Sequence, residues 1–249
     1  MANKVLLITG ASRGIGAATA IAAAQQGWQV CINYRSRQSE AQALVEQINA
    51  SGGQAISFAA DVGQQDQVSE LFEFVDTELG HLDALVNNAG IIDRKARIEE
   101  MDQQRLERMF QINIVGSFLC AGEAVRRMAK SHGGKGGAIV NVSSAASRLG
   151  SPGEFIDYAA SKGAIDTLTI GLAKEVAAEG IRVNAVRPGL IETDIHADTG
   201  DKDRPVRLAP LVPMQRTGLP DEVADCILWL LSEQAGYVTG SLLDVAGGR

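Results

Sequence analysis

The sequence predicts an α/β fold, in which a seven-stranded parallel sheet is doubly wound and carries helices on both faces. Short apolar runs alternate with helical patterns along the whole chain. These runs are continuously apolar, as expected for parallel strands that are covered on both faces. Strict alternation of strands and helices is typical of a doubly wound sheet. No repeat or linker divides the chain, so we expect one domain over residues 1–249.

The elements follow in order along the chain. The strands are expected where the apolar runs lie: KVLLIT at 4–9, WQVCINY at 28–34, QAISFAAD at 54–61, LDALVNN at 82–88, GAIVNVSS at 137–144, IRVNAVRPG at 181–189 and SLLDVAG at 241–247. The helices are expected between them, where apolar residues recur at helical spacing: at 14–26, 39–50, 65–79, 102–131, 155–180 and 221–233.

The composition limits the partners of this chain. Its 23 basic and 30 acidic residues give a net charge of -7, whereas nucleic-acid-binding proteins usually show a basic stripe. No stretch approaches the roughly 18 apolar residues of a membrane span, and the opening MANKVLLITG runs straight into a strand without a signal peptide. Cys31, Cys120 and Cys226 are scattered, as in a reducing cytoplasm. We expect a cytoplasmic protein without nucleic-acid, membrane or metal ligands.

A glycine-rich turn, TGASRGIG at 9–16, joins the first strand to the first helix. Gly10 suits a tight turn, Gly14 a close backbone approach to a pyrophosphate, and Gly16 close packing of helix on strand. Glycines also punctuate ordinary turns. Their position after the first strand favours a dinucleotide site of the Rossmann fold.

The end of the second strand, INYRSR, indicates which dinucleotide is bound. A site for NAD has a carboxylate here to bind the ribose hydroxyls, and no acidic residue lies between Ile32 and Gln38. Arg35 and Arg37 lie here instead, and Arg13 lies in the glycine turn. Guanidinium groups suit a 2′-phosphate. We predict NADP(H), with Arg35 as the best candidate, against the alternative of a solvated basic turn.

The motif YAASK places Tyr158 and Lys162 four residues apart, on one face of the predicted helix at 155–180. A neighbouring ammonium favours the phenolate and lowers the pKa of a tyrosine from about 10. Such a phenol can give and take a proton near neutral pH. The alternative is a surface tyrosine and lysine that happen to be adjacent.

Five ordered motifs carry a resemblance to a known family. They are TGxxxGxG at 9–16, NNAG at 87–90, NVSS at 141–144, YxxxK at 158–162, and Pro-Gly at 188–189 followed by Thr193. Over nearly its whole length the chain resembles the short-chain dehydrogenase/reductase family. The variants resemble its bacterial branches of 3-oxoacyl-acyl-carrier-protein reductases and glucose 1-dehydrogenases. The resemblance implies an oxidoreductase that interconverts a carbonyl and a secondary alcohol by hydride transfer.

The resemblance also implies four catalytic residues. Tyr158 is the acid/base, and Lys162 tunes it and holds the nicotinamide ribose. Ser144 ends the fifth strand and holds the substrate oxygen against Tyr158, whereas strand alternation points Ser143 the other way. Asn113 matches the asparagine that kinks its helix and holds a water for the proton relay.

The cofactor site implied by the resemblance is larger than the glycine turn. Asp61 resembles a residue that contacts adenine, although it also suits a turn or a helix cap. Thr193 is expected to reach the nicotinamide carboxamide. The full set is Gly10, Ser12, Arg13, Gly14, Ile15, Gly16, Arg35, Asp61, Val62, Asn88, Ala89, Gly90, Tyr158, Lys162, Pro188, Gly189, Ile191 and Thr193.

Two segments distinguish this chain. Fourteen positions separate Ser144 from Tyr158, where many relatives have thirteen, so the loop that walls the substrate pocket differs. We expect this wall to include Arg148, Leu149, Glu154, Phe155 and Ile156. The irregular segment at 192–220 is expected to cover the site as a lid. It includes His196, a candidate for substrate contact that also fits a simple surface residue.

Three functions remain open at this point. The first is an NADP(H)-dependent carbonyl reductase or alcohol dehydrogenase of small molecules. The second is the narrower acyl-carrier reductase or sugar dehydrogenase, and the acyl-carrier enzyme needs a basic docking surface, for which the candidates are Arg126, Arg127, Lys130 and Lys135. The third is a non-catalytic dinucleotide sensor, which has no need of a proton donor. Small-residue and apolar helix faces, together with the resemblance, imply a homotetramer.

Overall fold

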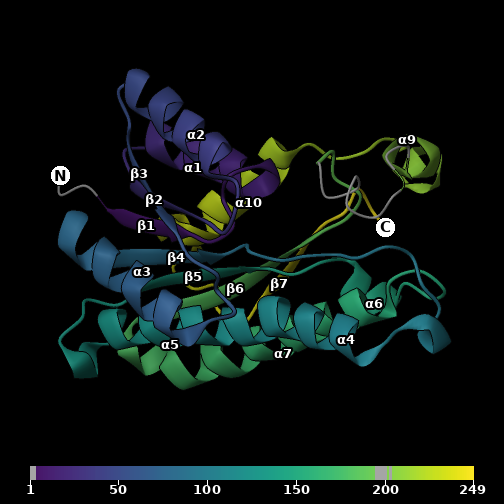
Figure 1. Ribbon diagram of the computed structural model, residues 1–249. Coiled ribbons are helices and arrows are strands. Elements are labelled where there is room, and N and C mark those ends of the chain that lie inside the picture. Colours follow the sequence, from purple (N-terminus) through teal and green to yellow (C-terminus); the bar gives the residue numbers. More distant parts are fainter. Residues whose placement is uncertain (1–3, 194–200, 202–203) are drawn as a thin grey trace.

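The computed structural model describes residues 4–193, 201 and 204–249. In that part of the chain, seven strands form one parallel sheet in the order β3-β2-β1-β4-β5-β6-β7, which confirms the predicted doubly wound fold (Figure 1). The strands are β1 (Val5–Ile8), β2 (Gln29–Tyr34), β3 (Gln54–Ala59), β4 (Leu82–Asn87), β5 (Gly137–Val142), β6 (Ile181–Pro188) and β7 (Leu242–Val245). The order reverses between β1 and β4, and ligands of open α/β sheets bind at such a switch point.

Helices cover both faces of the sheet (Figure 1). One layer consists of α1 (Gly14–Gln25), α2 (Gln38–Ala50) and α10 (Pro220–Leu231). The other consists of α3 (Gln65–Glu78), α4 (Gln103–Phe110), α5 (Gly116–Met128) and α7 (Ile156–Val176). Two short helices, α6 (Ala146–Leu149) and α9 (Arg204–Leu208), lie near the carboxyl ends of the strands. Single 3₁₀ turns occupy Ile98–Glu100, Lys130–His132, Ala177–Glu179, Ala209–Leu211 and Glu233–Ala235.

Two apolar cores hold these layers to the sheet. Successive side chains of a strand point to opposite faces, and β1 shows this directly. Leu6 and Ile8 belong to the core beneath α1, α2 and α10, whereas Val5 and Leu7 belong to the core beneath α3, α5 and α7. Because both faces are buried, the strands read as continuous apolar runs.

The helix predicted over 102–131 is interrupted, which corrects that prediction. A π-helical turn, Gln111–Val115, separates α4 from α5 and contains Asn113. A π-helical turn holds one extra residue and so interrupts the regular backbone hydrogen bonds of an α-helix. Beside it, the Ser117 hydroxyl donates to the Asn113 carbonyl at 3.1 Å. At the same place α5 approaches the β3–α3 connection closely, since a Cβ on Gly116 would lie 2.8 Å from Cγ2 of Val62. The start of α5 therefore lies close to the β3–α3 connection, at the carboxyl edge of the sheet.

The helix predicted over 155–180 ends earlier, because α7 stops at Val176 and one 3₁₀ turn follows. Among the described residues, no helix has both the length and the apolar character to cross a lipid bilayer.

Candidate active site

A cavity of about 660 Å³ opens over the carboxyl ends of the strands, at the switch point between β1 and β4. This is the size of a typical small-molecule or cofactor site. Every residue of the predicted cofactor set lines it except Gly16. Ser144, Tyr158 and Lys162 line it as well, so residues far apart in the sequence share one wall.

Two positions of the glycine turn between β1 and α1, Gly10 and Gly16, leave no room for a side chain. Gly10 has a φ of +61°, which disfavours other residues, and a Cβ there would lie 2.8 Å from Cα of Ala89. A Cβ on Gly16 would lie 2.6 Å from Nδ2 of Asn88, so Gly16 allows α1 to pack closely rather than lining the cavity. Arg13 makes no side-chain capping bond to α1, and the first turn of that helix has no acidic residue. A helix start of this kind suits an anionic pyrophosphate.

Buried polar side chains fix this turn in place. The Thr9 hydroxyl accepts bonds from the backbone N–H groups of Asn88 and Ala89, both at 3.0 Å. The Asn88 amide in turn donates to the carbonyls of Thr9 and Gly10 at 2.8 and 2.9 Å. Asn33, at 1% exposure, accepts from the Gly10 N–H at 3.2 Å. Sequence reasoning missed Asn33, although a polar residue inside an apolar strand was a usable signal.

Three arginines surround the end of the cavity near β2. Arg13, Arg35 and Arg37 all line it. Arg35 lies 3.6 Å from a carboxylate oxygen of Asp61 and is about half exposed. Asp61 also accepts the Gly63 N–H at 2.9 Å, so it serves the turn after β3 and faces the cavity at once. Arg37 pairs with Glu40 at 3.1 Å on the surface of α2. Two of the three arginines therefore have an acidic side chain beside them.

The two serines at the end of β5 point in opposite directions, as strand alternation predicts. Ser144 lines the cavity, and its hydroxyl accepts the Ala146 N–H at 3.1 Å. Ser143 also borders the cavity, but it is buried at 2% exposure and its hydroxyl donates to the Asp166 carboxylate at 2.7 Å. The Ser144 hydroxyl is therefore the better placed of the two to contact a substrate.

Lys162 is buried beside Tyr158, one turn along α7. Its ammonium donates to the Val142 carbonyl at 2.7 Å and lies 5.6 Å from the centroid of the Tyr158 ring. Burial lowers the pKa of Lys162 to about 8, partly opposed by the nearby Asp166 carboxylate. A cation held this close favours the phenolate form of a tyrosine. The pair is thus arranged to exchange a proton.

Asn113 lies behind this wall and does not line the cavity. Its amide accepts the Ile91 N–H at 2.8 Å and donates to the Ile91 carbonyl at 2.9 Å. It also donates to the Ser161 hydroxyl at 3.1 Å. Asn113 therefore ties the segment after β4 to α7.

An ion pair that sequence reasoning missed anchors the start of α7. The Asp157 side chain is fully buried and binds Arg105 of α4 through bonds of 2.7 and 3.3 Å. Arg105 also donates to the Arg94 carbonyl at 2.8 Å, and Asp157 accepts the Tyr158 N–H at 2.9 Å. The pair joins α4, α7 and the segment after β4 next to Tyr158.

Replacing Asp157 with asparagine is expected to lower the free energy of unfolding by about 3 kcal/mol, because it leaves the Arg105 cation unpaired in a nearly buried place. Urea denaturation of the full chain measures this. The surface variant Glu40→Gln is the matched control, since exposed pairs contribute less than about 1 kcal/mol. Equal decreases in the free energy of unfolding of the two variants would show that the Asp157–Arg105 pair stabilises the fold no more than a surface ion pair does.

The segment between Ser144 and Tyr158 forms the other wall of the cavity. Leu149, Glu154 and Phe155 line it as expected, whereas Arg148 and Ile156 do not. The Arg148 guanidinium is instead held by the C-terminal part of the chain, because it pairs with Asp244 of β7 at 3.4 Å and donates to the Arg249 carbonyl. This end is completed by Leu208, from the predicted lid, and by residues that sequence reasoning missed: Ile92, Ser151, Pro152 and Arg249.

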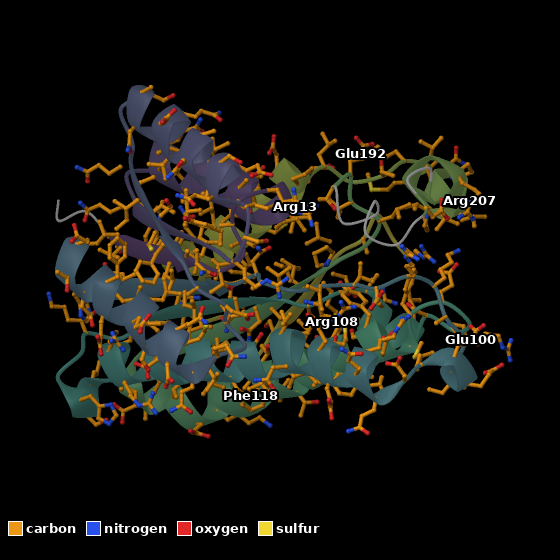
Figure 2. All side chains as sticks on the ribbon, in the orientation of Figure 1. Arg13, Glu100, Arg108, Phe118, Glu192 and Arg207 are labelled. Atoms are coloured by element: carbon orange, nitrogen blue, oxygen red, sulfur yellow. The ribbon has the colours of Figure 1, made fainter. Side chains whose placement is uncertain are left out.

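The predicted lid at 192–220 is described only in part. Asp201 lies 3.9 Å from Lys95, which also pairs with Glu154 at 2.7 Å. Leu208 of α9 lines the cavity, and Figure 2 labels its neighbour Arg207 on the same helix. His196, Asp198 and Lys202 lie outside the described residues.

A switch-point cavity with a glycine turn at the start of α1 defines a dinucleotide-binding Rossmann fold. Comparison with known proteins then assigns the family. Residues 10–249 match the family described as Enoyl-(Acyl carrier protein) reductase. The chain is 53% identical over 245 residues to a protein of Escherichia coli named uncharacterized oxidoreductase YgfF, which covers 98% of this chain and 99% of that protein.

Further relatives are named for specific reactions. A 3-oxoacyl-(acyl-carrier-protein) reductase of Synechocystis sp. is 38% identical over 98% of this chain and 96% of its own. Glucose 1-dehydrogenase 2 of Bacillus subtilis is 36% identical over 100% of this chain and 95% of its own. The crystal structure of a short-chain type dehydrogenase/reductase from Mycobacterium marinum has a TM-score of 0.92 and 36% identity, over 98% of this chain and 94% of that chain.

The chain belongs to the short-chain dehydrogenase/reductase family. It is therefore an oxidoreductase that acts on CH–OH or carbonyl groups of small molecules with a nicotinamide cofactor.

Proposed function

We propose that this protein is an NADP(H)-dependent enzyme that interconverts a carbonyl and a secondary alcohol, with Tyr158 as the acid/base. The observation that carries the proposal is the sharing of one cavity. Ser144, Tyr158 and Lys162 line the same cavity as the glycine turn and the arginines beside β2. A protein that only sensed a dinucleotide has no use for a proton donor beside a buried ammonium.

The reaction needs a hydride on the carbonyl carbon and a proton on the carbonyl oxygen. The bound nicotinamide supplies the hydride. Ser144 hydrogen-bonds the substrate oxygen and holds it against Tyr158, whose phenol donates the proton in reduction and accepts it in oxidation. Lys162 stabilises the phenolate and hydrogen-bonds the nicotinamide ribose. We propose that Asn113 supports a water that returns the proton to the solvent.

The proposed preference for NADP(H) rests on charge. Arg35 and Arg13 line the end of the cavity where the adenosine ribose is expected, and Asp61 already has Arg35 as a partner. A guanidinium can bind a 2′-phosphate with two N–H groups. A relative named 3-oxoacyl-(acyl-carrier-protein) reductase and one named glucose 1-dehydrogenase share this scaffold.

Replacing Arg35 with alanine is expected to weaken NADPH binding at least tenfold and to change NADH binding less than about threefold, since a charge-assisted bond contributes about 1.5–3 kcal/mol. Fluorescence titration of each cofactor measures both constants. Arg37→Ala is the control, because Arg37 already pairs with Glu40 on the surface. If wild-type protein binds NADH as tightly as NADPH, the proposed preference is wrong.

The substrate end of the cavity favours a substrate with an apolar body. Besides Ser151 and Arg249, its walls are formed by the apolar residues Ile92, Leu149, Pro152, Phe155 and Leu208. The acid in this wall, Glu154, is paired with Lys95. We propose a small or medium-sized ketone or aldehyde, in preference to a sugar, whose hydroxyls need many hydrogen-bond partners.

The proposed basic surface for an acyl-carrier protein finds little support. Arg126 pairs with Glu123 at 2.5 Å, and Arg127 pairs with both Glu123 at 2.5 Å and Asp76 at 2.8 Å. These residues end α5 just ahead of β5, so they lie at the amino edge of the sheet, opposite the cavity. Carbonyl reduction of free molecules is therefore the preferred function.

The test is a panel of carbonyl compounds incubated with the full-length protein and NADPH, followed by the loss of NADPH absorbance. The panel contains apolar ketones, aldehydes and a 3-oxoacyl thioester, and glucose with NADP⁺ tests the reverse reaction. Turnover of apolar carbonyls is expected. Tight NADPH binding without turnover of any compound would favour the sensor instead.

We also propose a cytoplasmic homotetramer. Apolar side chains are exposed on the outer surface of the α5 and α7 layer, where Figure 2 labels Phe118. Phe118 is 52% exposed, and Val115 and Ile170 are also exposed. Large apolar side chains gathered on one face are typical of interfaces between subunits.

A further inference from the structure

Next to Lys162 lies a cluster of three polar side chains, of which Asp166 and Ser143 are buried and Arg187 is partly buried. Asp166 follows Lys162 by one turn of α7 and is 7% exposed. One of its carboxylate oxygens accepts the Ser143 hydroxyl at 2.7 Å. The other binds Arg187 of β6 at 2.9 and 3.1 Å. The Ser143 hydroxyl also lies 3.1 Å from the Lys162 carbonyl. The cluster therefore joins β5, β6 and α7 around the base of Lys162.

Lys162 carries its charge in a buried place. It is 4% exposed, and its ammonium donates a hydrogen bond to the neutral Val142 carbonyl. A buried ammonium without an anion nearby tends to lose its proton. The charged side chains on the elements packed around it include Asp157 and Asp166 on α7, Arg105 on α4, Arg148 on α6 and Arg187 on β6.

These charges do not act equally on Lys162. Arg105 binds both carboxylate oxygens of Asp157, whereas Arg187 binds only one oxygen of Asp166 and leaves the other to the neutral Ser143 hydroxyl. Arg148 pairs with Asp244 of β7. Asp166 lies on the same helix face as Lys162 and shares its carboxylate with Ser143 and Arg187.

We propose that Asp166 is a positioning residue that keeps the Tyr158–Lys162 pair protonated at neutral pH, while Ser143 and Arg187 fix its carboxylate in place. The role of the pair rests on the proposed function. Tyr158 and Lys162 titrate as a coupled unit, so a negative charge nearby raises the pH at which the unit loses a proton. The pKa of Lys162 agrees, because burial lowers it and Asp166 opposes that effect.

The sign of the expected change follows from the charge. Asp166→Asn removes a negative charge, which makes both the phenolate and the neutral amine easier to form. The pH midpoint at which Tyr158 ionises is then expected to be at least about half a pH unit lower than in wild type. This follows from the Coulomb interaction between charges about one helical turn apart. A carboxylate that served only to hold the fold would leave this midpoint unmoved.

The test uses ultraviolet difference spectra of tyrosinate in the full-length protein, which need no substrate. Tyr158 is isolated from the other two tyrosines by subtracting Tyr158→Phe, and Tyr158→Phe/Asp166→Asn for the variant. Ser143→Ala, which removes a hydrogen bond without charge, and Asp244→Asn, whose carboxylate lies beyond Arg187, are the matched controls. Ser143→Ala loosens the Asp166 carboxylate but keeps its charge, and Asp244→Asn removes a charge beyond Arg187, so each control is expected to shift the midpoint much less than Asp166→Asn does.

A midpoint unchanged in Asp166→Asn, or moved equally by both controls, would overturn the proposal. If Asp166→Asn does not fold, Arg187→Gln gives the opposite test, because it leaves the Asp166 charge uncompensated and should raise the midpoint. An unchanged midpoint there would also overturn it. A lowered midpoint in a protein that turns over no carbonyl would contradict the proposed function and leave the role of Asp166 standing.

Discussion

Replacing Tyr158 with phenylalanine is expected to lower kcat for carbonyl reduction by about a thousandfold, the usual contribution of a positioned acid. The change removes one oxygen and leaves the ring, which lies 5.6 Å from the Lys162 ammonium, free to keep its place. NADPH binding should therefore stay within about threefold of wild type. Steady-state kinetics on the best carbonyl of the panel and a fluorescence titration measure the two effects separately.

The control for this variant is Tyr237→Phe, since Tyr237 is fully exposed and lies outside the cavity. Tyr237→Phe should keep full activity. A Tyr158→Phe enzyme with more than about a tenth of wild-type kcat would mean that another group supplies the proton.

Replacing Lys162 with methionine is expected to lower kcat at least about a hundredfold, because the phenolate loses its cation. The same variant should change how stability depends on pH. The folded pKa of Lys162 is about 8, below the unfolded value of about 10.4, so the unfolded state binds more protons between these pH values. Below pH 8 the buried charge lowers wild-type stability by about 3 kcal/mol, and this penalty disappears as the pH rises to the unfolded pKa.

Methionine has no proton to lose, so it lacks this dependence on pH. The free energy of unfolding of wild type should therefore rise relative to Lys162→Met between pH 7 and pH 9.5. Urea denaturation of both proteins at the two pH values measures the difference, with Lys174→Met as the control on the exposed side of α7. Parallel behaviour of wild type and Lys162→Met would show that Lys162 keeps an ordinary pKa.

Most of the fold could be predicted because its signals are local. A parallel strand covered on both faces must be apolar throughout, and this made each of the strands visible in the sequence. The break in the helix at 102–131 had no such signal except Asn113 itself. Its cause is tertiary, since the Asn113 amide bonds to Ile91 and Ser161, which are distant in sequence.

The candidate site was predictable where motifs stand at strand ends, because the carboxyl ends of parallel strands meet at one edge. Ser144 and the glycine turn reached the cavity for this reason. Ion pairs between distant segments left no pattern to detect. Arg105 and Asp157 are 52 residues apart, and Arg35 meets Asp61 only because β2 and β3 are neighbours. The position of Arg148 likewise depends on Asp244 of β7.

The central claim is that this chain moves a hydride from NADPH to a carbonyl carbon. The most direct measurement uses NADPH with deuterium at both positions of its hydride-bearing carbon, the best carbonyl of the panel, and mass spectrometry of the alcohol formed. The account predicts a deuterated alcohol with wild-type protein, and almost none with Tyr158→Phe in the same time. An alcohol without deuterium, or equal product from both proteins, would contradict it.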